Sequence, residues 1–211
     1  WLLSLAGLPY LEKMVPLDGG WDNTNFLLDL ADGSKVVLKA WFANQVEEVD
    51  RVILRHIHLD SHGIPTTVPI KLADNRSFAD RNGVAWTLLP YIPGGHLGND
   101  SESLTDLGKV LARMHEIPTS DCFPTEYRMG FSLFEEVASL SKDGGPDPSF
   151  VGLLASEASA IEEALAVEIP VGILHGDLFP DNVIGKGKVG AILDLEEAWI
   201  GPKVFDLAMA F

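Results

Sequence analysis

The first ninety residues alternate short apolar runs with turn residues, a pattern typical of β-strands. The strand-like runs are 13–17, 26–30, 34–40 and 84–89. Asp32-Gly33 lies between the second and third runs and is a strong signal for a hairpin turn. From Asn44 to about Ser61 the valines and isoleucines recur at a helical period, so we predict one helix among the strands.

The pattern changes near residue 90, where Pro-Tyr-Ile-Pro-Gly-Gly carries dense turn chemistry. Helical periods follow at 104–115, 131–140 and 150–166, and short apolar runs at 171–174 and 189–193 predict two strands. We therefore predict an α+β fold with a strand-rich lobe at 1–90, a hinge at 91–95 and a mostly helical lobe at 96–211. Because the chain begins at Trp1 and stops at Phe211 inside an apolar run, we expect the second lobe to be incomplete.

Composition narrows the function classes. The 211 residues are 46% hydrophobic, which supports a large core, and the formal net charge is −16. Binding to nucleic acid through phosphates requires a basic surface, so nucleic acid is not an expected partner. Cys122 is the single cysteine, which excludes an internal disulfide and a zinc cluster and favours a cytoplasmic protein. No apolar run approaches the ~18–20 residues of a membrane span, so we expect no membrane partner. The oligomeric state is not indicated.

The candidate chemistry lies on loops at the ends of the last two predicted strands. Asp177 and Asn182 follow the first of these strands, and Asp194 directly follows the second. A carboxylate such as Asp177 can orient a hydroxyl group and accept its proton during attack on a phosphate. The amide oxygen of Asn182 and the carboxylate of Asp194 suit Mg²⁺, which prefers oxygen ligands.

The complete pattern is His-x-Asp-x-x-x-x-Asn, a strand, and then Asp. An isolated His-x-Asp is usually an ordinary solvated turn, but the complete pattern is far more specific. A metal-dependent phosphohydrolase using His175, Asp177 and Asp194 is an alternative. It needs more histidine or carboxylate ligands than the sequence offers near the motif. We expect His175 to support the loop through hydrogen bonds.

Four segments, ILHGDLFPDNVI, AILDLEEAW, VFDLAMAF and LTDLGKVLARMHEI, resemble the aminoglycoside phosphotransferase and choline kinase superfamily, which has the protein-kinase-like fold. The resemblance covers nearly the whole chain. Within that superfamily, LFPDN after IPVGILHGD is most similar to homoserine kinases of this fold. The resemblance implies Asp177 as catalytic base, Asn182 and Asp194 as metal ligands, and Asp206 as a brace for the catalytic loop.

The resemblance also implies a lysine on the third strand that contacts the α- and β-phosphates of ATP. Lys39 is our choice, because Lys35 stands at the strand start near the turn. Such a lysine needs a carboxylate from the following helix. Glu47 and Glu48 both qualify by position. We choose Glu48, which shares an inward stripe with Val52, although both glutamates could be solvated helix charges.

The glycine-containing loop 19–25, with Gly20 and Asn23, would lie over the phosphates, unless it is an ordinary hairpin loop. Leu89, Tyr91 and Ile92 at the hinge would surround the adenine ring. A group of three histidines, His56, His58 and His62, shares one helix end without a matching carboxylate set, which favours a solvated face over a metal site.

Together these features predict an enzyme that uses ATP and Mg²⁺ to phosphorylate a hydroxyl group of a small molecule. Homoserine or a similar amino alcohol is the expected acceptor. An aminoglycoside- or choline-type phosphotransferase is an alternative, and a nucleotide-binding pseudokinase without turnover is an alternative of another class. Homoserine kinases usually carry an aromatic residue after the metal-loop aspartate, whereas Leu195 follows here. Glu196 or Glu197 would then face a cationic substrate amine, or form a solvated turn.

Overall fold

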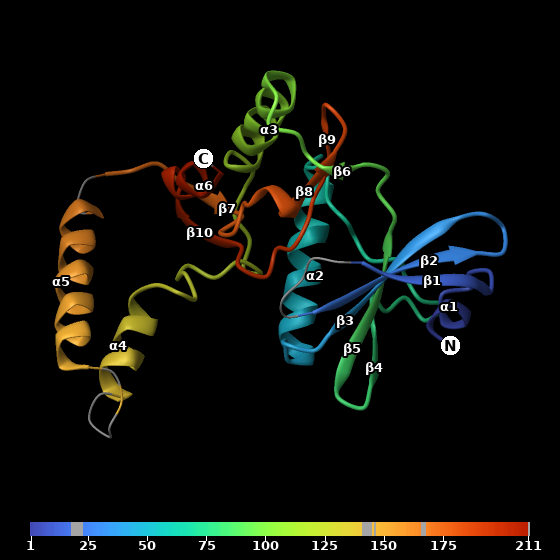
Figure 1. The fold of residues 1–211 in the computed structure, drawn as a ribbon, viewed down its shortest axis with the longest axis horizontal. Coiled ribbons are helices and arrows are strands. Elements are labelled where there is room, and N and C mark those ends of the chain that lie inside the picture. Colours follow the sequence, from blue (N-terminus) through green and yellow to red (C-terminus); the bar gives the residue numbers. More distant parts are fainter. Residues whose placement is uncertain (18–22, 141–144, 146, 166–167, 211) are drawn as a thin grey trace.

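The computed structural model describes residues 1–17, 23–140, 145, 147–165 and 168–210 (Figure 1). Its N-terminal part is a five-stranded antiparallel sheet in the order β1-β2-β3-β5-β4. The strands are β1 (Leu11–Leu17), β2 (Thr24–Leu30), β3 (Lys35–Trp41), β4 (Ala79–Arg81) and β5 (Val84–Pro90), and a short helix α1 (Leu2–Leu5) precedes them. The four predicted strands and the hairpin turn are confirmed, with Gly33 in the left-handed region at φ 83°. Sequence reasoning missed α1 and β4.

Helix α2 (Val46–Ser61) stands between the sheet and the C-terminal elements (Figure 1). Val49, Val52, Ile53 and Leu59 of this helix are buried. They belong to a hydrophobic core that also includes Leu111 and other residues of the C-terminal part. The core therefore continues from one part of the molecule into the other, and α2 is the element that connects them.

The C-terminal part contains helices and very short strands. The helices are α3 (Ser101–Met114), α4 (Phe131–Leu140), α5 (Pro148–Leu165), α6 (Val204–Ala210) and the 3₁₀ turn η2 (Pro180–Asn182). The strands are β6 (Gly95–His96), β7 (Val171–Leu174), β8 (Val183–Gly185), β9 (Val189–Ile192) and β10 (Trp199–Pro202). They pair as β6-β8-β9 and β10-β7. The predicted helices and the two predicted strands are confirmed, so the fold is α+β as expected.

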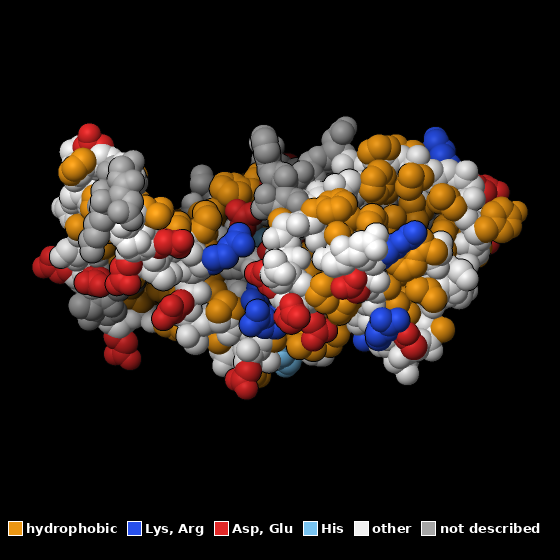
Figure 2. Space-filling model, turned by 90° about the horizontal axis from the view of Figure 1, so that it is seen from below, with side chains coloured by type: hydrophobic (Ala, Val, Ile, Leu, Met, Phe, Trp, Pro, Cys, Tyr) orange, Lys and Arg blue, Asp and Glu red, His pale blue; other side chains and the backbone are white. Residues whose placement is uncertain are grey.

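Local sequence explains why α3 begins at residue 101. The Asp100 side chain accepts hydrogen bonds from the backbone N–H groups of Glu102 and Ser103, which caps the helix N-terminus. Helices α4 and α5 contact each other and project from the rest of the molecule (Figure 1). On the face shown in Figure 2, hydrophobic side chains gather toward the sheet end of the molecule, and acidic side chains are spread over the rest of that face.

The segment 91–95 connects β5 to β6, and β6 pairs with β8 of the C-terminal part. The division into 1–90, 91–95 and 96–211 stays a prediction. Among the described residues, no helix combines the length and apolar character needed to cross a membrane.

Candidate active site

The loop after β7 is fixed by a buried carboxylate from α6. Asp206 has no exposed surface and accepts hydrogen bonds from the backbone N–H groups of His175 (2.9 Å) and Gly176 (3.0 Å). His115 Nε2, at the end of α3, lies 3.0 Å from the same carboxylate. A buried charge is tolerated only when such partners replace its lost hydration. Asp206 therefore joins α3, α6 and the loop that carries Asp177.

His175 connects this loop to the second candidate loop. Its Nδ1 accepts a hydrogen bond from the Asp177 backbone N–H at 3.2 Å. The other ring nitrogen, Nε2, lies 2.7 Å from the carbonyl oxygen of Leu193. Because a carbonyl oxygen can only accept, Nε2 carries the proton and the ring is neutral. His175 thus acts as a structural support, as the sequence predicted.

Gly176 allows the loop to approach the chain segment after Asp194. Its φ is 81°, in the region that favours glycine, and a Cβ atom there would lie 2.3 Å from the carbonyl oxygen of Glu197. No side chain fits at that distance. The glycine of the motif is therefore required by the close contact between two loops.

Asp177 and Asn182 are held together within the loop. Asn182 Nδ2 donates to the backbone carbonyl of Asp177 at 2.7 Å and to its carboxylate oxygen Oδ2 at 3.1 Å. These bonds use the amide nitrogen and leave the amide oxygen available for a cation. The Leu193 N–H donates to the carbonyl of Asn182 at 2.8 Å, which brings the two candidate metal ligands into neighbouring positions.

Asp194 has a left-handed backbone conformation, with φ 55°, and its side chain is 43% exposed. Burial acts to raise the pKa of this carboxyl group, but the Lys39 ammonium and other neighbours outweigh that effect and lower the pKa. Asp194 is therefore ionised at neutral pH, as a metal ligand must be. Among the described residues, no three His, Cys, Asp or Glu side chains form a metal site by themselves. Two protein oxygen ligands fit Mg²⁺, which completes its shell with water and substrate phosphates.

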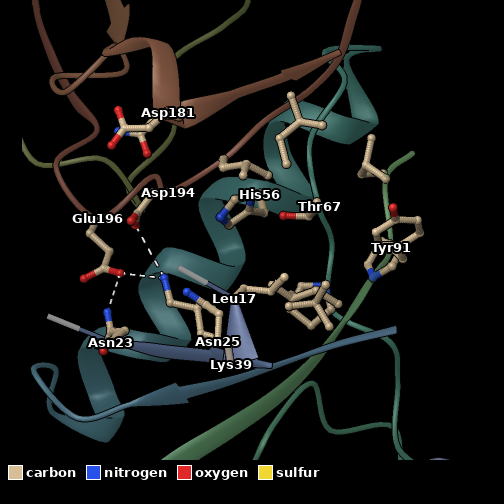
Figure 3. A pocket seen from close by; sticks show the side chains of 18 of the residues that line it. Leu17, Asn23, Asn25, Lys39, His56, Thr67, Tyr91, Asp181, Asp194 and Glu196 are labelled. Carbon is tan, nitrogen blue, oxygen red and sulfur yellow. Dashed lines mark hydrogen bonds and ion pairs between the residues drawn. The ribbon is translucent and has the colours of Figure 1, made fainter. Parts of the chain in front are cut away.

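Lys39 extends from β3 toward the same loop (Figure 3). Its Nζ lies 2.7 Å from Glu196 Oε1 and 3.5 Å from Asp194 Oδ1, and it stands 3.8 Å from the centroid of the Trp41 ring. The Lys39 side chain is 9% exposed. Lys35, at the start of β3, is 42% exposed and pairs with Asp29, as expected for a solvated surface residue.

The carboxylate that pairs most closely with Lys39 in the structure is that of Glu196, whereas Glu48 was expected. Within the part of the chain that the structure describes, Glu48 makes neither a hydrogen bond nor an ion pair with Lys39. Glu48 lies in the first turn of α2, whereas the residues of this helix that line the site are Ile53 and His56. Those residues stand about 7–12 Å further along the helix axis. Glu48 lies on the predicted inward stripe, but it belongs to an earlier turn of the helix than the residues that line the cavity.

Asn23 reaches the site from the segment before β2. Its Nδ2 donates to Glu196 Oε1 at 2.8 Å and to Asn44 Oδ1 at 3.3 Å. Figure 3 shows Asn23 and Lys39 converging on the same carboxylate. Gly20, the other residue predicted from this loop, lies outside the described residues.

A cavity of about 500 Å³ contains the predicted chemistry. Its lining includes the predicted residues Asn23, Lys39, Leu89, Tyr91, Ile92, Asp177, Asn182 and Asp194. Strands β3 and β5 supply one wall, and the loops after β7 and β9 supply the other (Figure 3). The geometry therefore brings together, in one space, a carboxylate that can accept a proton, two oxygen-bearing side chains that suit a cation, a lysine and an apolar strand end.

Arg55 is a site residue that sequence reasoning missed. Its Nη1 donates to the backbone carbonyls of Leu195 and Glu196, both at 2.8 Å, and its Nε donates to the carbonyl of Cys122 at 2.8 Å. Burial lowers the pKa of the guanidinium, which still remains charged at neutral pH. Arg55 thus fixes the backbone of the segment after Asp194 to helix α2.

His56 was also missed, and the prediction of a solvated histidine face is wrong for this residue. It is 6% exposed, and its Nδ1 lies 2.6 Å from Thr66 Oγ1. That hydroxyl donates to the carbonyl of Ile192 at 2.8 Å, so it accepts the Nδ1 proton. Burial, followed by the Lys39 charge, lowers the pKa of His56 to about 3. His56 is therefore neutral in the folded protein.

One signal in the sequence could have identified these two residues. Arg55 and His56 lie three and four positions after the buried Val52, and Leu59 lies four and three positions after them. Residues at these spacings share one face of a helix. A charged or polar residue on the buried stripe of an amphipathic helix requires a partner, which is a reason to expect a structural or functional role.

Glu197 follows Glu196 in the chain and also lines the cavity. It forms an ion pair with Arg128, while its second oxygen, Oε2, is buried without a partner among the described residues. Burial raises the pKa of Glu197, and Arg128 opposes the shift. The neighbouring Tyr127 stacks on Trp199 with 5.5 Å between ring centroids. Glu197 thus lines the same cavity as Asp177, with one carboxylate oxygen paired and the other buried.

Comparison with known proteins adds the family. The profile of the phosphotransferase enzyme family (APH) matches residues 13–211. The chain is 30% identical over 208 residues to a homoserine kinase of Neisseria meningitidis serogroup B (strain ATCC BAA-335 / MC58), covering 95% of this chain and 67% of that protein. It is 28% identical over 199 residues to a homoserine kinase of Rhodopseudomonas palustris (strain BisA53), covering 90% of this chain and 60% of that protein.

Solved structures support the fold. An amicoumacin kinase, hAmiN, in complex with AMP-PNP, Ca²⁺ and Ami matches with a TM-score of 0.72 at 16% identity, covering 99% of this chain and 66% of that one. A choline/ethanolamine kinase family protein from Mesorhizobium loti matches with a TM-score of 0.68 at 18% identity, covering 98% and 67%. The protein-kinase-like fold expected from the sequence is confirmed. The chain spans 60% to 67% of the length of these four proteins.

Proposed function

Because the chain belongs to the phosphotransferase enzyme family, we propose that it transfers the γ-phosphate of ATP to a hydroxyl group of a small amino alcohol, with homoserine as the first choice. The observation that carries this proposal is the convergence of Lys39, Asp177, Asn182 and Asp194 on one cavity. Phosphoryl transfer needs these four elements in one place, because the protein contributes mainly positioning and charge stabilisation.

Each residue has a role in this proposal. Asp177 orients the acceptor hydroxyl and takes its proton as the oxygen attacks phosphorus. Lys39 contacts the α- and β-phosphates. Asn182 and Asp194 would hold Mg²⁺, which when bound neutralises charge on the phosphate oxygens. The hydrogen bonds from Asn182 to Asp177 keep the proton acceptor beside the ligand pair.

The adenine ring would lie at the end of β5. Leu89, Tyr91 and Ile92 line the cavity there, and backbone groups of this segment are the available hydrogen-bonding partners. Residue 90 is a proline without an N–H, so donors must come from its neighbours. Asn23 would extend over the phosphates from the opposite side. A cytoplasmic location agrees with ATP as the phosphate donor and with a single free cysteine.

For the acceptor, the support is the similarity to homoserine kinases and the state of the two glutamates after Asp194. Glu196 is engaged by Lys39 and Asn23. Glu197 lines the cavity with Asp177, and its ion pair with Arg128 leaves the buried Oε2 without a donor among the described residues. We assign Glu197 to the ammonium group of the acceptor, because a carboxylate in the cavity wall can pair with a cationic N–H donor.

The decisive experiment is an ADP-release assay of the intact protein with ATP and Mg²⁺. Homoserine, choline, methylthioribose and a set of aminoglycosides serve as acceptors. We expect homoserine to give the highest kcat/KM. A preference for another acceptor would overturn the substrate assignment alone. Nucleotide binding without ADP release above background, with any acceptor, would support the pseudokinase alternative instead.

A further inference from the structure

We propose that Glu196, in the segment after Asp194, is the positioning residue of Lys39, in place of a glutamate of helix α2. This inference rests on the proposed function, because it assumes that Lys39 contacts the nucleotide phosphates. The lysine has a long flexible side chain, so a phosphate-binding role requires a partner that fixes its ammonium group.

The contacts favour Glu196 clearly. Lys39 Nζ lies 2.7 Å from Glu196 Oε1, a normal hydrogen-bond length, whereas the distance to Asp194 Oδ1 is 3.5 Å. The exposed fractions of the Lys39 and Glu196 side chains are 9% and 11%, so water competes little for either group. The Trp41 ring centroid lies 3.8 Å from the ammonium group, and Trp41 Nε1 donates to Thr87 Oγ1 at 3.0 Å.

Among the described residues, the carboxylates that pair with Lys39 are those of Glu196 and Asp194, and neither belongs to helix α2. The residues of this helix that line the cavity are Ile53 and His56. His56 is neutral, because burial lowers its pKa to about 3. Glu48, one or two turns earlier, makes neither a hydrogen bond nor an ion pair with Lys39 among the described residues. The helix contributes instead through Arg55, whose Nη1 holds the backbone carbonyl of Glu196 at 2.8 Å.

Asn23 connects a third segment to the same atom. Its Nδ2 donates to Glu196 Oε1 at 2.8 Å, so one carboxylate oxygen accepts from both Asn23 and Lys39. Glu196 therefore joins the segment before β2, strand β3 and the segment after β9 (Figure 3). Lys39 Nζ lies 3.5 Å from Asp194 Oδ1, so the lysine is held more closely by Glu196 than by the candidate metal ligand.

The first experiment measures binding of AMP-PNP with Mg²⁺ to the intact protein by calorimetry. We expect Glu196→Gln to weaken binding about tenfold, the effect of losing about 1.4 kcal/mol, and Glu48→Gln to change it less than twofold. Glu196→Asp keeps the charge and should restore part of the affinity. The reverse order, in which Glu48→Gln binds AMP-PNP more weakly than Glu196→Gln does, would overturn the inference.

A double-mutant cycle with Lys39→Met separates positioning of the lysine from direct contact with the metal. If Glu196 acts through Lys39, Glu196→Gln has no further effect on AMP-PNP affinity in the Lys39→Met background. An undiminished effect in that background would mean that Glu196 acts on Mg²⁺ itself, and the inference fails. If the wild-type protein binds no AMP-PNP, the proposed function fails first, which is a different result.

Discussion

At the scale of single residues, the carboxylate of Asp177 is the group most directly tied to chemistry. In the Asp177→Asn variant, an amide replaces the proton acceptor while the bonds that shape the loop through the Asp177 backbone remain. We expect kcat to fall by about 10²–10⁴. AMP-PNP affinity, measured by calorimetry, should stay within twofold of the wild-type value.

Asp181→Asn is the matched control for this variant, because Asp181 is an exposed carboxylate of the same loop. It should lower kcat much less than Asp177→Asn does. Turnover of Asp177→Asn at the wild-type rate would show that Asp177 is not the catalytic base.

The two lysines of β3 give a second prediction at this scale. Lys39 is nearly buried and faces the cavity, whereas Lys35 is exposed and pairs with Asp29. Lys39→Ala should raise KM for ATP by roughly 10- to 100-fold, the range for losing a hydrogen bond to a charged group. Lys35→Ala should leave KM for ATP nearly unchanged. Steady-state kinetics at saturating acceptor would test the order, and the opposite order would contradict it.

How well the site could be predicted from the sequence depends on how far apart its residues lie along the chain. Asp177, Asn182 and Asp194 stand in one short stretch, so their spacing alone indicated a shared site, and the structure brings them together. The partner of the strand lysine is different, because Glu196 follows it by 157 positions and only the folded chain brings the two side chains into contact. Sequence periodicity placed Glu48 on an inward stripe but carried no information about which turn of the helix packs beside Lys39.

At the scale of elements, the strands of the N-terminal sheet were predictable because each has a clear alternation and a turn at its end. Strands β4, β6 and β8 contain three residues or fewer, which is too short for a periodic signal. The sequence pattern did not separate strand β10 from the segment that follows Asp194, because Trp199 and Ile200 do not alternate with polar residues. Tertiary pairing with β7, which sequence patterns do not report, makes it a strand.

Helix α2 carries a prediction about pH. The pKa of His56 is about 3 in the folded protein, below the value of 6.5 that applies when it is unfolded. Above pH 6.5 the His56 ring is neutral in both the folded and the unfolded protein, so its titration does not reduce the free energy of unfolding. As the pH falls from 6.5 toward 3, the unfolded state binds a proton that the folded state does not, so the free energy of unfolding decreases.

His56→Gln keeps a hydrogen-bond donor for Thr66 and removes this titration. Urea unfolding at pH 7 and pH 4.5 should show a smaller loss of stability on acidification in His56→Gln than in the wild type. The slope removed is at most about 1.4 kcal/mol per pH unit. Exposed His62, changed to Gln, is the control and should leave the pH dependence as it is. Equal acid sensitivity of His56→Gln and the wild type would contradict the burial argument.

At the scale of the whole molecule, the cavity is formed where the N-terminal sheet meets the C-terminal loops. Lys39 and Asn23 come from one side, and Asp177 and Asp194 come from the other. The shared core around α2 and the Arg55 hydrogen bonds fix the relation between the two sides. The proposed acceptor contact belongs to this scale too, because Glu197 and its ion-pair partner Arg128 come from distant segments of the chain.

The last prediction concerns that acceptor. If Glu197 binds the ammonium group, Glu197→Gln should raise KM for homoserine about tenfold and leave KM for ATP unchanged. The matched substrate is 4-hydroxybutyrate, which keeps the hydroxyl and the carboxylate but lacks the amine. Wild type and Glu197→Gln should use it equally poorly, because the contact in question is absent from both reactions. If the variant loses as much with 4-hydroxybutyrate as with homoserine, Glu197 supports the loop through Arg128 instead of binding the amine, and the preference for amino alcohols needs another source.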